Sequence, residues 1–169
     1  QDKIGAVLLF KNENQFLPQW INYYDLLGVD FFFIYNNNPK NQYNFKLLKD
    51  KYKERVIFIN WPFPYQLKKF PSFCSQLGCY HQSLYKYRNM KWIIYNDIDE
   101  YIVLRKTDKN LKEFLFNYNH HQISSLLYEC MWFGCSNGRD YNEHNFLKRL
   151  IKCKGETESS KFKGTNIKY

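Results

Sequence analysis

The stretch Lys91-Trp-Ile-Ile-Tyr-Asn-Asp-Ile-Asp-Glu-Tyr-Ile-Val103 decides the fold class of this chain. A continuous apolar run, Trp92 to Tyr95, is followed at once by three acids, Asp97, Asp99 and Glu100. An apolar run of this kind suits a central strand that is buried on both faces, as in a parallel sheet. The acids then lie at the carboxyl end of the strand, where open α/β sheets bind their ligands.

Asp97 and Asp99 are two residues apart, so their side chains point to the same side of an extended chain. Two converging carboxylates offer the hard oxygen ligands that suit Mg²⁺ or Mn²⁺ and a phosphorylated ligand. The alternative is a solvated acidic turn, because Asp-x-Asp by itself is a weak motif. The strand context alone supports a metal site and a solvated turn about equally.

Strands and helices are predicted to alternate along the chain. Apolar runs predict strands and apolar residues at helical spacing predict helices, with Gly28 as a helix stop. The predicted strands are 4–10, 29–35, 56–59 and 92–95, and the predicted helices are 17–27, 43–52 and 73–90. The last helix is expected to bury Phe73, Leu77, Tyr80, Leu84 and Tyr87. This β-α-β-α-β-α-β order predicts a parallel sheet with helices on both faces.

Four further segments are predicted besides these strands and helices. Residues 61–71 are predicted to form an irregular connection, because prolines and aromatic residues alternate there. Asp108 is the predicted cap of a helix that turns Leu111, Phe114, Leu115 and Tyr118 inward, and residues 123–128 and 131–133 are predicted late strands. Since no repeat or linker interrupts the sequence, a single domain over residues 1–169 is expected.

The composition is that of a globular protein. The chain has 169 residues, of which 44% are hydrophobic and 20% aromatic, enough for a large core. No run approaches the roughly 18–20 apolar residues that a membrane span requires, and no signal peptide is visible. The start at Gln1 and the end at Tyr169 suggest a fragment. We therefore expect a soluble domain and leave its compartment open, cytoplasmic or lumenal, with room for a membrane tether in a missing segment.

The net charge of +9 favours an anionic partner, but the basic residues are scattered rather than clustered. A solvated basic face is the preferred interpretation, and no nucleic-acid partner is expected. Five cysteines do not indicate a disulfide framework, because their number is odd. The pairs Cys74/Cys79 and Cys130/Cys135 are five residues apart, which does not align them on a helix or a strand. Most are interpreted as small core residues rather than zinc ligands.

Several kinds of site are disfavoured by missing motifs. The first strand is not followed by Gly-x-Gly-x-x-Gly, and the chain has no phosphate-loop Gly-Lys-Ser and no Gly-x-Ser-x-Gly. The four histidines show no spacing with a nucleophile. A carboxylate-held metal therefore remains as the main electrophile.

Six sequence blocks, in order over nearly the whole chain, resemble glycosyltransferase family 92 and its relatives. The six blocks, in chain order, are Phe10-Lys-Asn-Glu13; Leu17-Pro-Gln-Trp-Ile21 with Leu27-Gly-Val-Asp30; Ile34-Tyr-Asn-Asn37; Asn60-Trp-Pro62 with Gln76; Lys91-Trp with Asp97-Ile-Asp-Glu-Tyr101; and Trp132-Phe-Gly134 with Arg149. The resemblance implies a GT-A fold, a Rossmann-like sheet with a nucleotide-sugar site at the carboxyl ends of its strands. It also implies Mn²⁺ (or Mg²⁺) held by the Asp-x-Asp on the donor diphosphate.

The resemblance also implies roles for single residues. Asp99 would be the direct metal ligand, Asp97 a ribose or water-mediated metal contact, and Glu100 a hydrogen-bonding support for the loop. The base and ribose pocket would be lined by Lys11, Asn12, Glu13, Tyr35 and Asn36. Gln76 and His81, at the start of a helix, would lie near the donor. The alternatives are ordinary loop polarity for the pocket residues and a packed surface histidine for His81.

On the acceptor side, the expectations are a UDP-sugar donor and a glycan or other hydroxyl acceptor. Trp132 and Phe133 would stack on an acceptor sugar or pack in the core. Asp140, with Glu143 nearby, is the candidate general base, and the alternative for both is a solvated loop acid. The resemblance also implies that residues 1–169 form one GT-A-type catalytic domain without its C-terminal acceptor-side portion. The histidine that commonly completes the metal site in these enzymes would lie beyond Tyr169. The sugar, the stereochemical outcome and the oligomeric state stay open.

Two other functional classes remain as alternatives. A metal-dependent nucleotidyltransferase would use the same acids, yet such enzymes usually place Gly-Ser before them, and none occurs here. A basic nucleic-acid-binding domain would need clustered arginines with exposed aromatic residues, whereas the aromatic residues of this chain fall mostly at core spacing.

Overall fold

The computed structural model describes residues 2–38, 40, 45–67, 70–104, 108–118, 123–128, 133–135 and 150–153. At positions 67, 70–73, 133–135 and 150–153 the description covers the backbone. The chain divides into two compact units, Gln1–Ile123 and Ser124–Tyr169. The first unit contains the central sheet, and the second contains a short pair of strands.

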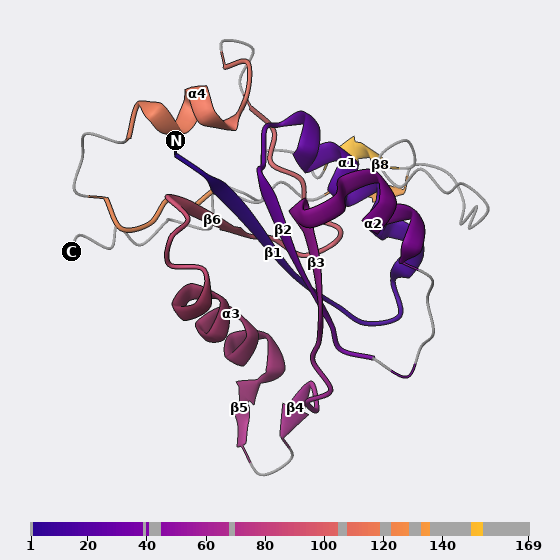
Figure 1. Ribbon diagram of the computed structural model, residues 1–169. Coiled ribbons are helices and arrows are strands. Elements are labelled where there is room, and N and C mark those ends of the chain that lie inside the picture. Colours follow the sequence, from indigo (N-terminus) through magenta and orange to yellow (C-terminus); the bar gives the residue numbers. More distant parts are fainter. Residues whose placement is uncertain are drawn as a thin grey trace. The chain divides into compact units, whose positions relative to one another are not determined.

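Four parallel strands form the central sheet (Figure 1). The strands are β1 (Ile4–Phe10), β2 (Phe31–Asn36), β3 (Val56–Asn60) and β6 (Trp92–Tyr95), in the spatial order β3-β2-β1-β6. All seven residues of β1 are buried, as expected of an inner strand in a parallel sheet. This arrangement confirms the predicted Rossmann-like α/β fold. Because the strands are parallel, their carboxyl ends meet at one edge of the sheet.

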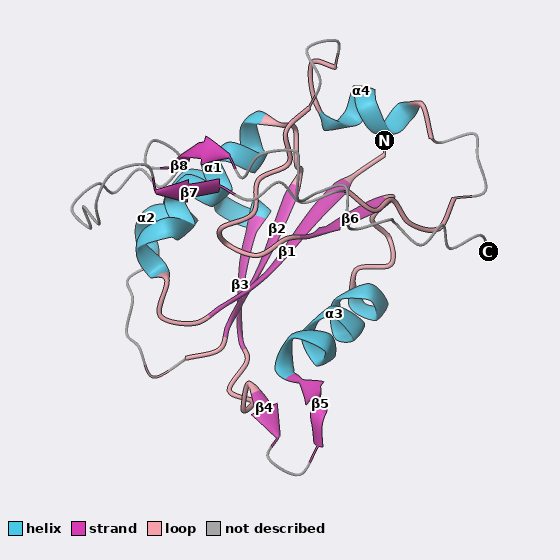
Figure 2. Ribbon diagram, turned by 180° about the vertical axis from the view of Figure 1, so that it is seen from behind, coloured by secondary structure: helices cyan, strands magenta, loops and turns pink. Residues whose placement is uncertain are grey.

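Helices cover both faces of the sheet (Figures 1 and 2). The helical segments are η1 (Asn14–Phe16), α1 (Leu17–Leu26), α2 (Lys46–Tyr52), η2 (Lys53–Arg55), α3 (Ser75–Lys86) and α4 (Leu111–Phe116). On one face, Phe32 of β2 contacts Trp20 of α1 and Tyr52 of α2, each with ring centroids 6.2 Å apart. On the other face, side chains of β1 and β2 pack against Cys79 of α3 and against Tyr87. Helix α1 ends before Gly28, whose φ of 92° explains the predicted stop.

Two antiparallel strand pairs complete the described structure. One pairs β4 (Gln66–Leu67) with β5 (Phe70–Cys74), and the other pairs β7 (Phe133–Cys135) with β8 (Leu150–Cys153) in the second unit. The prediction of an irregular connection over 61–71 was therefore wrong from Gln66 onward. No strand forms over residues 123–128, where one was predicted. The strand predicted at 131–133 overlaps β7 at Phe133, and Met131 and Trp132 lie outside the described residues.

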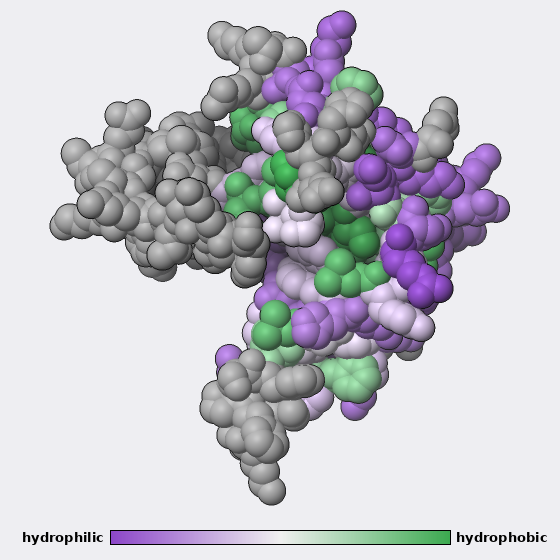
Figure 3. All heavy atoms as spheres, turned by 90° about the vertical axis from the view of Figure 1, so that its left-hand side faces the viewer, coloured by the Kyte–Doolittle hydropathy of each residue, from purple (hydrophilic) through white to green (hydrophobic). Residues whose placement is uncertain are grey.

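The hydrophobic spacing of α3 predicts its buried face only in part: Tyr87 is buried and Tyr80 packs against the core as predicted, whereas two leucines do not. Leu77 and Leu84 are 48% and 52% exposed, whereas the buried helix residues are Ser75, Cys79 and Ser83. The physical reason lies in the sheet, whose large rings fill the space beneath the helix. Phe33 stacks on Tyr87, just after the helix, at 3.5 Å between ring centroids. Small side chains let the helix approach this aromatic layer, and the leucines are left outside. Figure 3 views this side of the molecule, where hydrophobic and hydrophilic residues are interspersed.

The cap of α4 is Asn110 rather than the predicted Asp108. The Asn110 Oδ1 accepts a hydrogen bond from the backbone N–H of Glu113 at 2.9 Å, and Glu113 Oε2 accepts one from the N–H of Lys109 at 3.0 Å. This reciprocal pair satisfies backbone donors at the start of the helix. Leu111 and Leu115 are buried as predicted. Among the described residues, no helix is both long enough and apolar enough to cross a membrane.

The orientation of α3 can be tested with two adjacent residues. Ser83 is fully buried and its Oγ donates to the carbonyl oxygen of Tyr80 at 2.8 Å. Ser83→Leu overpacks this contact and is expected to lower the free energy of unfolding by about 1–3 kcal/mol. The control Leu84→Ala alters an exposed position and should cost less than about 1 kcal/mol. Urea denaturation measures both values, and a larger loss at Leu84 than at Ser83 would restore the predicted face.

Candidate functional site

The carboxyl ends of the central strands enclose a hollow of about 460 Å³. Its described lining comes from the ends of β1 and β2, the segment after β3, the start of α3 and the turn after β6. The lining residues are Leu9, Phe10, Lys11, Glu13, Asn37, Tyr65, Gln76, Asp97, Ile98 and Asp99. The fold thus brings together five residues that the sequence predicted for the site: Lys11, Glu13, Gln76, Asp97 and Asp99.

The acidic turn after β6 is closed by its own third acid. The backbone N–H of Glu100 donates to the carbonyl oxygen of Asp97 at 3.0 Å, and Glu100 Oε2 accepts from the N–H of Asp97, also at 3.0 Å. Glu100 therefore supports the loop through hydrogen bonds, in the manner predicted for it. The closed turn presents Asp97 and Asp99 to the hollow.

Helix α1 holds this turn through three aromatic side chains. Trp20 Nε1 donates to the carbonyl oxygen of Asp97 at 3.1 Å, and the Tyr24 hydroxyl donates to that of Glu100 at 3.0 Å. The Tyr24 oxygen also accepts from the N–H of Ile102 at 3.2 Å, while the Tyr23 hydroxyl donates to the Ile102 carbonyl at 2.8 Å. Sequence reasoning placed Trp20 and Tyr24 on the buried face of α1 and missed their polar function. Their position four residues apart, each with a polar tip, is the signal that was available.

Gln76 connects α3 to the acidic turn. Its Nε2 donates to Asp97 Oδ1 at 2.6 Å and to the Tyr80 hydroxyl at 2.8 Å. These two contacts orient the Asp97 carboxylate from the first turn of α3. Gln76 therefore acts on the site through Asp97, in addition to lining the hollow.

Three carboxylates line the hollow, those of Glu13, Asp97 and Asp99. Desolvation raises the pKa of Asp97, the charges of Glu100 and Asp99 raise it further, and the Gln76 hydrogen bond opposes the shift. Desolvation likewise raises the pKa of Glu13, with the backbone N–H of Lys11 opposing and Asp99 and Asp97 adding to the rise. None of the three carboxylates Glu13, Asp97 and Asp99 forms an ion pair with a described residue. Uncompensated acids of this kind favour a bound cation.

The residues present fit a divalent metal only in part. Asp97 and Asp99 supply hard oxygen ligands of the kind that Mg²⁺ and Mn²⁺ prefer. Over the described residues, however, no group of three or more His, Cys, Asp or Glu side chains is placed to hold a metal ion. A metal at the two aspartates would therefore need further oxygen ligands from water and from a bound phosphate, which is common for Mg²⁺ sites.

Three other predicted residues are not in the described lining of the hollow. Tyr35 is fully buried between the sheet and α3, where its hydroxyl donates to Gln82 Oε1 at 2.9 Å. Asn36 Oδ1 accepts from the backbone N–H of Asn38 at 2.9 Å. Asn12, at a φ of 61°, accepts at its Oδ1 from the Asn38 side chain at 2.7 Å. The Tyr35 ring is buried and is not among the described residues that line the hollow.

The structure describes two of the remaining predicted residues, His81 and Phe133. His81 is exposed on α3 and is not among the described residues that line the hollow. Phe133 lies in β7. The positions Trp132, Asp140, Glu143 and Arg149 lie outside the described residues, so the general base stays a prediction.

Asn37 is a lining residue that the sequence analysis missed as a site residue. Its backbone N–H donates to the carbonyl oxygen of Phe10 at 2.9 Å. Its Nδ2 donates to the carbonyl oxygens of Trp61 and Phe63 at 2.9 Å and 2.8 Å. Asn37 therefore ties the segment after β3 to the end of β2. A run of three asparagines directly after a buried strand was the available signal.

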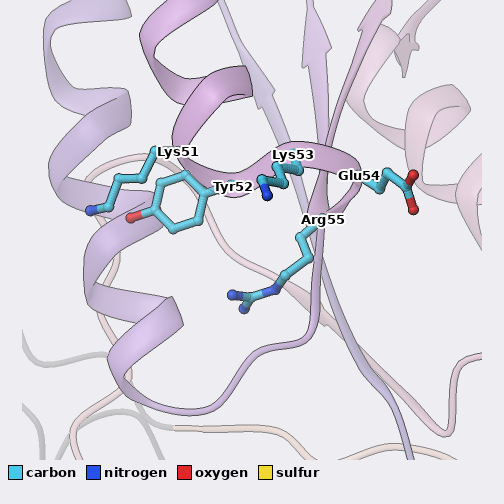
Figure 4. A pocket seen from close by; sticks show the side chains of 5 residues that line it. All are labelled: Lys51, Tyr52, Lys53, Glu54 and Arg55. Carbon is cyan, nitrogen blue, oxygen red and sulfur yellow. The ribbon is translucent and has the colours of Figure 1, made fainter.

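A second hollow of similar volume, about 460 Å³, lies at residues Lys51 to Arg55 (Figure 4). The guanidinium of Arg55 is already engaged, since its Nη2 pairs with Asp25 Oδ1 at 2.6 Å and its Nε donates to the Asp30 carbonyl at 2.9 Å. Lys51 lies in the last turn of α2, where a positive charge offsets the helix dipole. This hollow precedes β3 and so lies at the amino ends of the strands. The acidic hollow is therefore the candidate functional site.

Comparison with known proteins agrees with this geometry. The model of glycosyltransferase family 92 matches residues 6–168. The chain belongs to glycosyltransferase family 92. A family 92 protein of rice (Oryza sativa subsp. japonica) is 28% identical over 130 residues, which cover 76% of this chain and 21% of the relative. A family 92 protein of Ricinus communis is 26% identical over 132 residues, which cover 76% of this chain and 22% of the relative.

The chain spans about a fifth of the length of these curated relatives. No solved structure matches the chain significantly. The family match includes every described residue that lines the acidic hollow. The resemblance found in the sequence blocks is thereby confirmed at the level of the family.

The anchoring of the acidic turn by α1 predicts a measurable loss of stability. Tyr24→Phe removes one donor and leaves the Ile102 N–H and the Glu100 carbonyl without this partner. The free energy of unfolding is expected to fall by about 1–3 kcal/mol. Tyr85→Phe is the control, because Tyr85 is 76% exposed and its change should cost less than about 0.5 kcal/mol. Equal effects of the two substitutions in urea denaturation would contradict the anchoring role.

The raised pKa of Asp97 predicts a pH-dependent gain in stability for Asp97→Asn. Because the pKa in the folded state lies above the ordinary value of 3.8, ionisation of the carboxyl group removes stability as the pH rises through this range. The asparagine side chain does not ionise and still offers an oxygen to Gln76. The melting temperature of the variant should exceed that of the wild type at pH 7, and the difference should shrink as the pH falls towards about 4.

Asp50→Asn provides the control for this measurement, because Asp50 is an exposed acid on α2, away from the hollow. Its melting temperature should follow that of the wild type across the same pH range. A lower melting temperature for Asp97→Asn than for the wild type at pH 7 would show that the carboxylate stabilises the fold and would refute the argument.

Proposed function

We propose that this chain is the catalytic domain of a metal-dependent glycosyltransferase that uses a nucleotide-sugar donor, with a UDP-sugar favoured. The acceptor is a hydroxyl group of a glycan or of another molecule. One observation carries the proposal: Asp97 and Asp99 line a hollow at the carboxyl ends of parallel strands together with Lys11. Membership of family 92 supports the glycosyltransferase class.

The hollow has the parts that such a reaction requires. Asp97 and Asp99 would hold Mn²⁺ or Mg²⁺, which stabilises the negative charge that gathers on the departing diphosphate. Gln76 orients the Asp97 carboxylate, and α1 fixes the backbone of the turn. Lys11 brings a positive charge into the lining, near the same diphosphate. Interactions of this kind accelerate the reaction when they are stronger in the transition state than in the ground state.

Glu13 supplies an acceptor for the nucleoside. It lines the hollow after β1, and its raised pKa reflects desolvation together with the nearby aspartates. A carboxylate at this position can accept hydrogen bonds from ribose hydroxyl groups or from a base N–H. Asp140 remains the proposed general base for the acceptor hydroxyl.

A nucleotidyltransferase is the second candidate, because it would use the same pair of aspartates. The family match disfavours it, and so does the dispersed positive charge of the chain. Binding to random DNA at physiological salt should be no tighter than about micromolar and should weaken as salt is added. Tight binding that resists salt would favour the nucleotidyltransferase.

The proposal predicts metal-dependent binding of a nucleoside diphosphate. UDP should raise the melting temperature when Mn²⁺ or Mg²⁺ is present and should not do so in the presence of a chelator. Asp99→Asn should abolish the shift and leave the fold intact, because Asp99 is an exposed residue of the turn. Asp50→Asn, remote from the hollow, should retain the full shift.

Two outcomes of this measurement would count against the proposal. If UDP raises the melting temperature equally with and without metal, or equally in Asp99→Asn, the proposed metal site is refuted. We expect the affinity for UDP to exceed those for GDP and ADP at least about tenfold. If calorimetry shows that GDP or ADP binds with an affinity equal to that of UDP, the preference for uridine is refuted.

A further inference from the structure

An aromatic residue that the sequence analysis did not single out lies on the wall of the acidic hollow. Tyr65 follows β3 and lines the hollow, and it is 47% exposed. The other aromatic residue of the described lining, Phe10, is 1% exposed and packs in the core. Tyr65 is therefore the aromatic side chain in this described lining that has surface left for a ligand.

The segment that carries Tyr65 is held at several points. Asn37 donates to the carbonyl oxygens of Trp61 and Phe63, and the N–H of Ser75 donates to the carbonyl oxygen of Tyr65 at 2.9 Å. Trp61 Nε1 donates to Ser75 Oγ at 2.8 Å. These contacts order the backbone before any ligand binds, which lowers the entropy cost of using the ring as a binding surface.

The order of the strands places Tyr65 relative to the acids. Asp97 and Asp99 follow β6, whereas the Tyr65 segment is tied through Asn37 to the end of β2. In the order β3-β2-β1-β6, β1 lies between these two ends. A diphosphate held at the aspartates therefore has its nucleoside free to extend across the end of β1, towards Tyr65.

We propose that Tyr65 stacks on the base of the nucleoside diphosphate. This inference rests on the proposed function, since it takes the ligand of the hollow to be a nucleoside diphosphate. Flat heteroaromatic rings stack on tyrosine with little dependence on base identity. Tyr65 thus provides affinity for the nucleoside, and the aspartates provide affinity for the diphosphate.

Calorimetry with two probes, UDP and inorganic pyrophosphate, both in Mn²⁺, separates these contributions. Tyr65→Ala should weaken UDP binding about tenfold, as expected for the loss of one stacking contact, and should leave pyrophosphate binding unchanged. Tyr65→Phe keeps the ring and should bind UDP within about twofold of the wild type. The control is Tyr85→Ala on α3, because Tyr85 is 76% exposed and is not among the described lining residues. This control should bind both probes as the wild type does.

Each of the remaining outcomes overturns the inference. Unchanged UDP binding in Tyr65→Ala, with a wild type that binds UDP, refutes stacking and leaves the proposed function standing. Equal weakening for UDP and pyrophosphate shows that Tyr65 only shapes the hollow, and a loss of UDP binding in Tyr65→Phe assigns the effect to the hydroxyl group. A wild type that binds neither probe in Mn²⁺ refutes the proposed function itself.

Discussion

The hydrogen bonds from α1 to the acidic turn are the constraint on which the site depends. In the described sheet, β6 is an edge strand that pairs with β1 over four residues, so the turn beyond it has no neighbouring strand. Its backbone groups still need partners. Trp20, Tyr23 and Tyr24 provide them from a helix more than 75 residues earlier in the chain. One helix therefore covers the sheet and fixes the backbone that carries Asp97 and Asp99.

This anchoring explains how the chain tolerates like charges in one hollow. Desolvation raises the pKa values of Asp97 and Glu13, so ionisation of either carboxyl group costs stability in the folded chain. The hydrogen bonds of the turn and the contact of Gln76 with Asp97 offset that cost locally. Groups with shifted pKa values often mark functional sites, because a bound ligand can relieve the unfavourable interactions there. Under the proposed function, the ligands that would relieve them are a cation and the diphosphate of the donor.

Much of the fold and part of the site follow from local patterns. The four sheet strands are short apolar runs, and the acids that follow Tyr95 mark the edge where ligands bind, so their positions could be predicted to within a few residues. Lys11, Glu13 and Gln76 came from the family resemblance and do line the hollow. The buried face of α3 could be predicted only in part, because its hydrophobic spacing includes Tyr80 and Tyr87, which pack in the core, but also Leu77 and Leu84, which are exposed. The packing of Phe33 and Tyr87 is a tertiary property, and it selects the small residues instead.

The sequence by itself determined the parallel α/β class, the family and the acidic turn, because these depend on residue type and on spacing along the chain. Only the tertiary structure decided which polar and aromatic side chains face the hollow. Tyr35 lies within β2 and its ring is buried against α3, whereas Tyr65 lies on a segment that Asn37 and Ser75 hold over the end of the sheet. Their roles differ because a side chain's direction depends on contacts between distant segments, which no local pattern records.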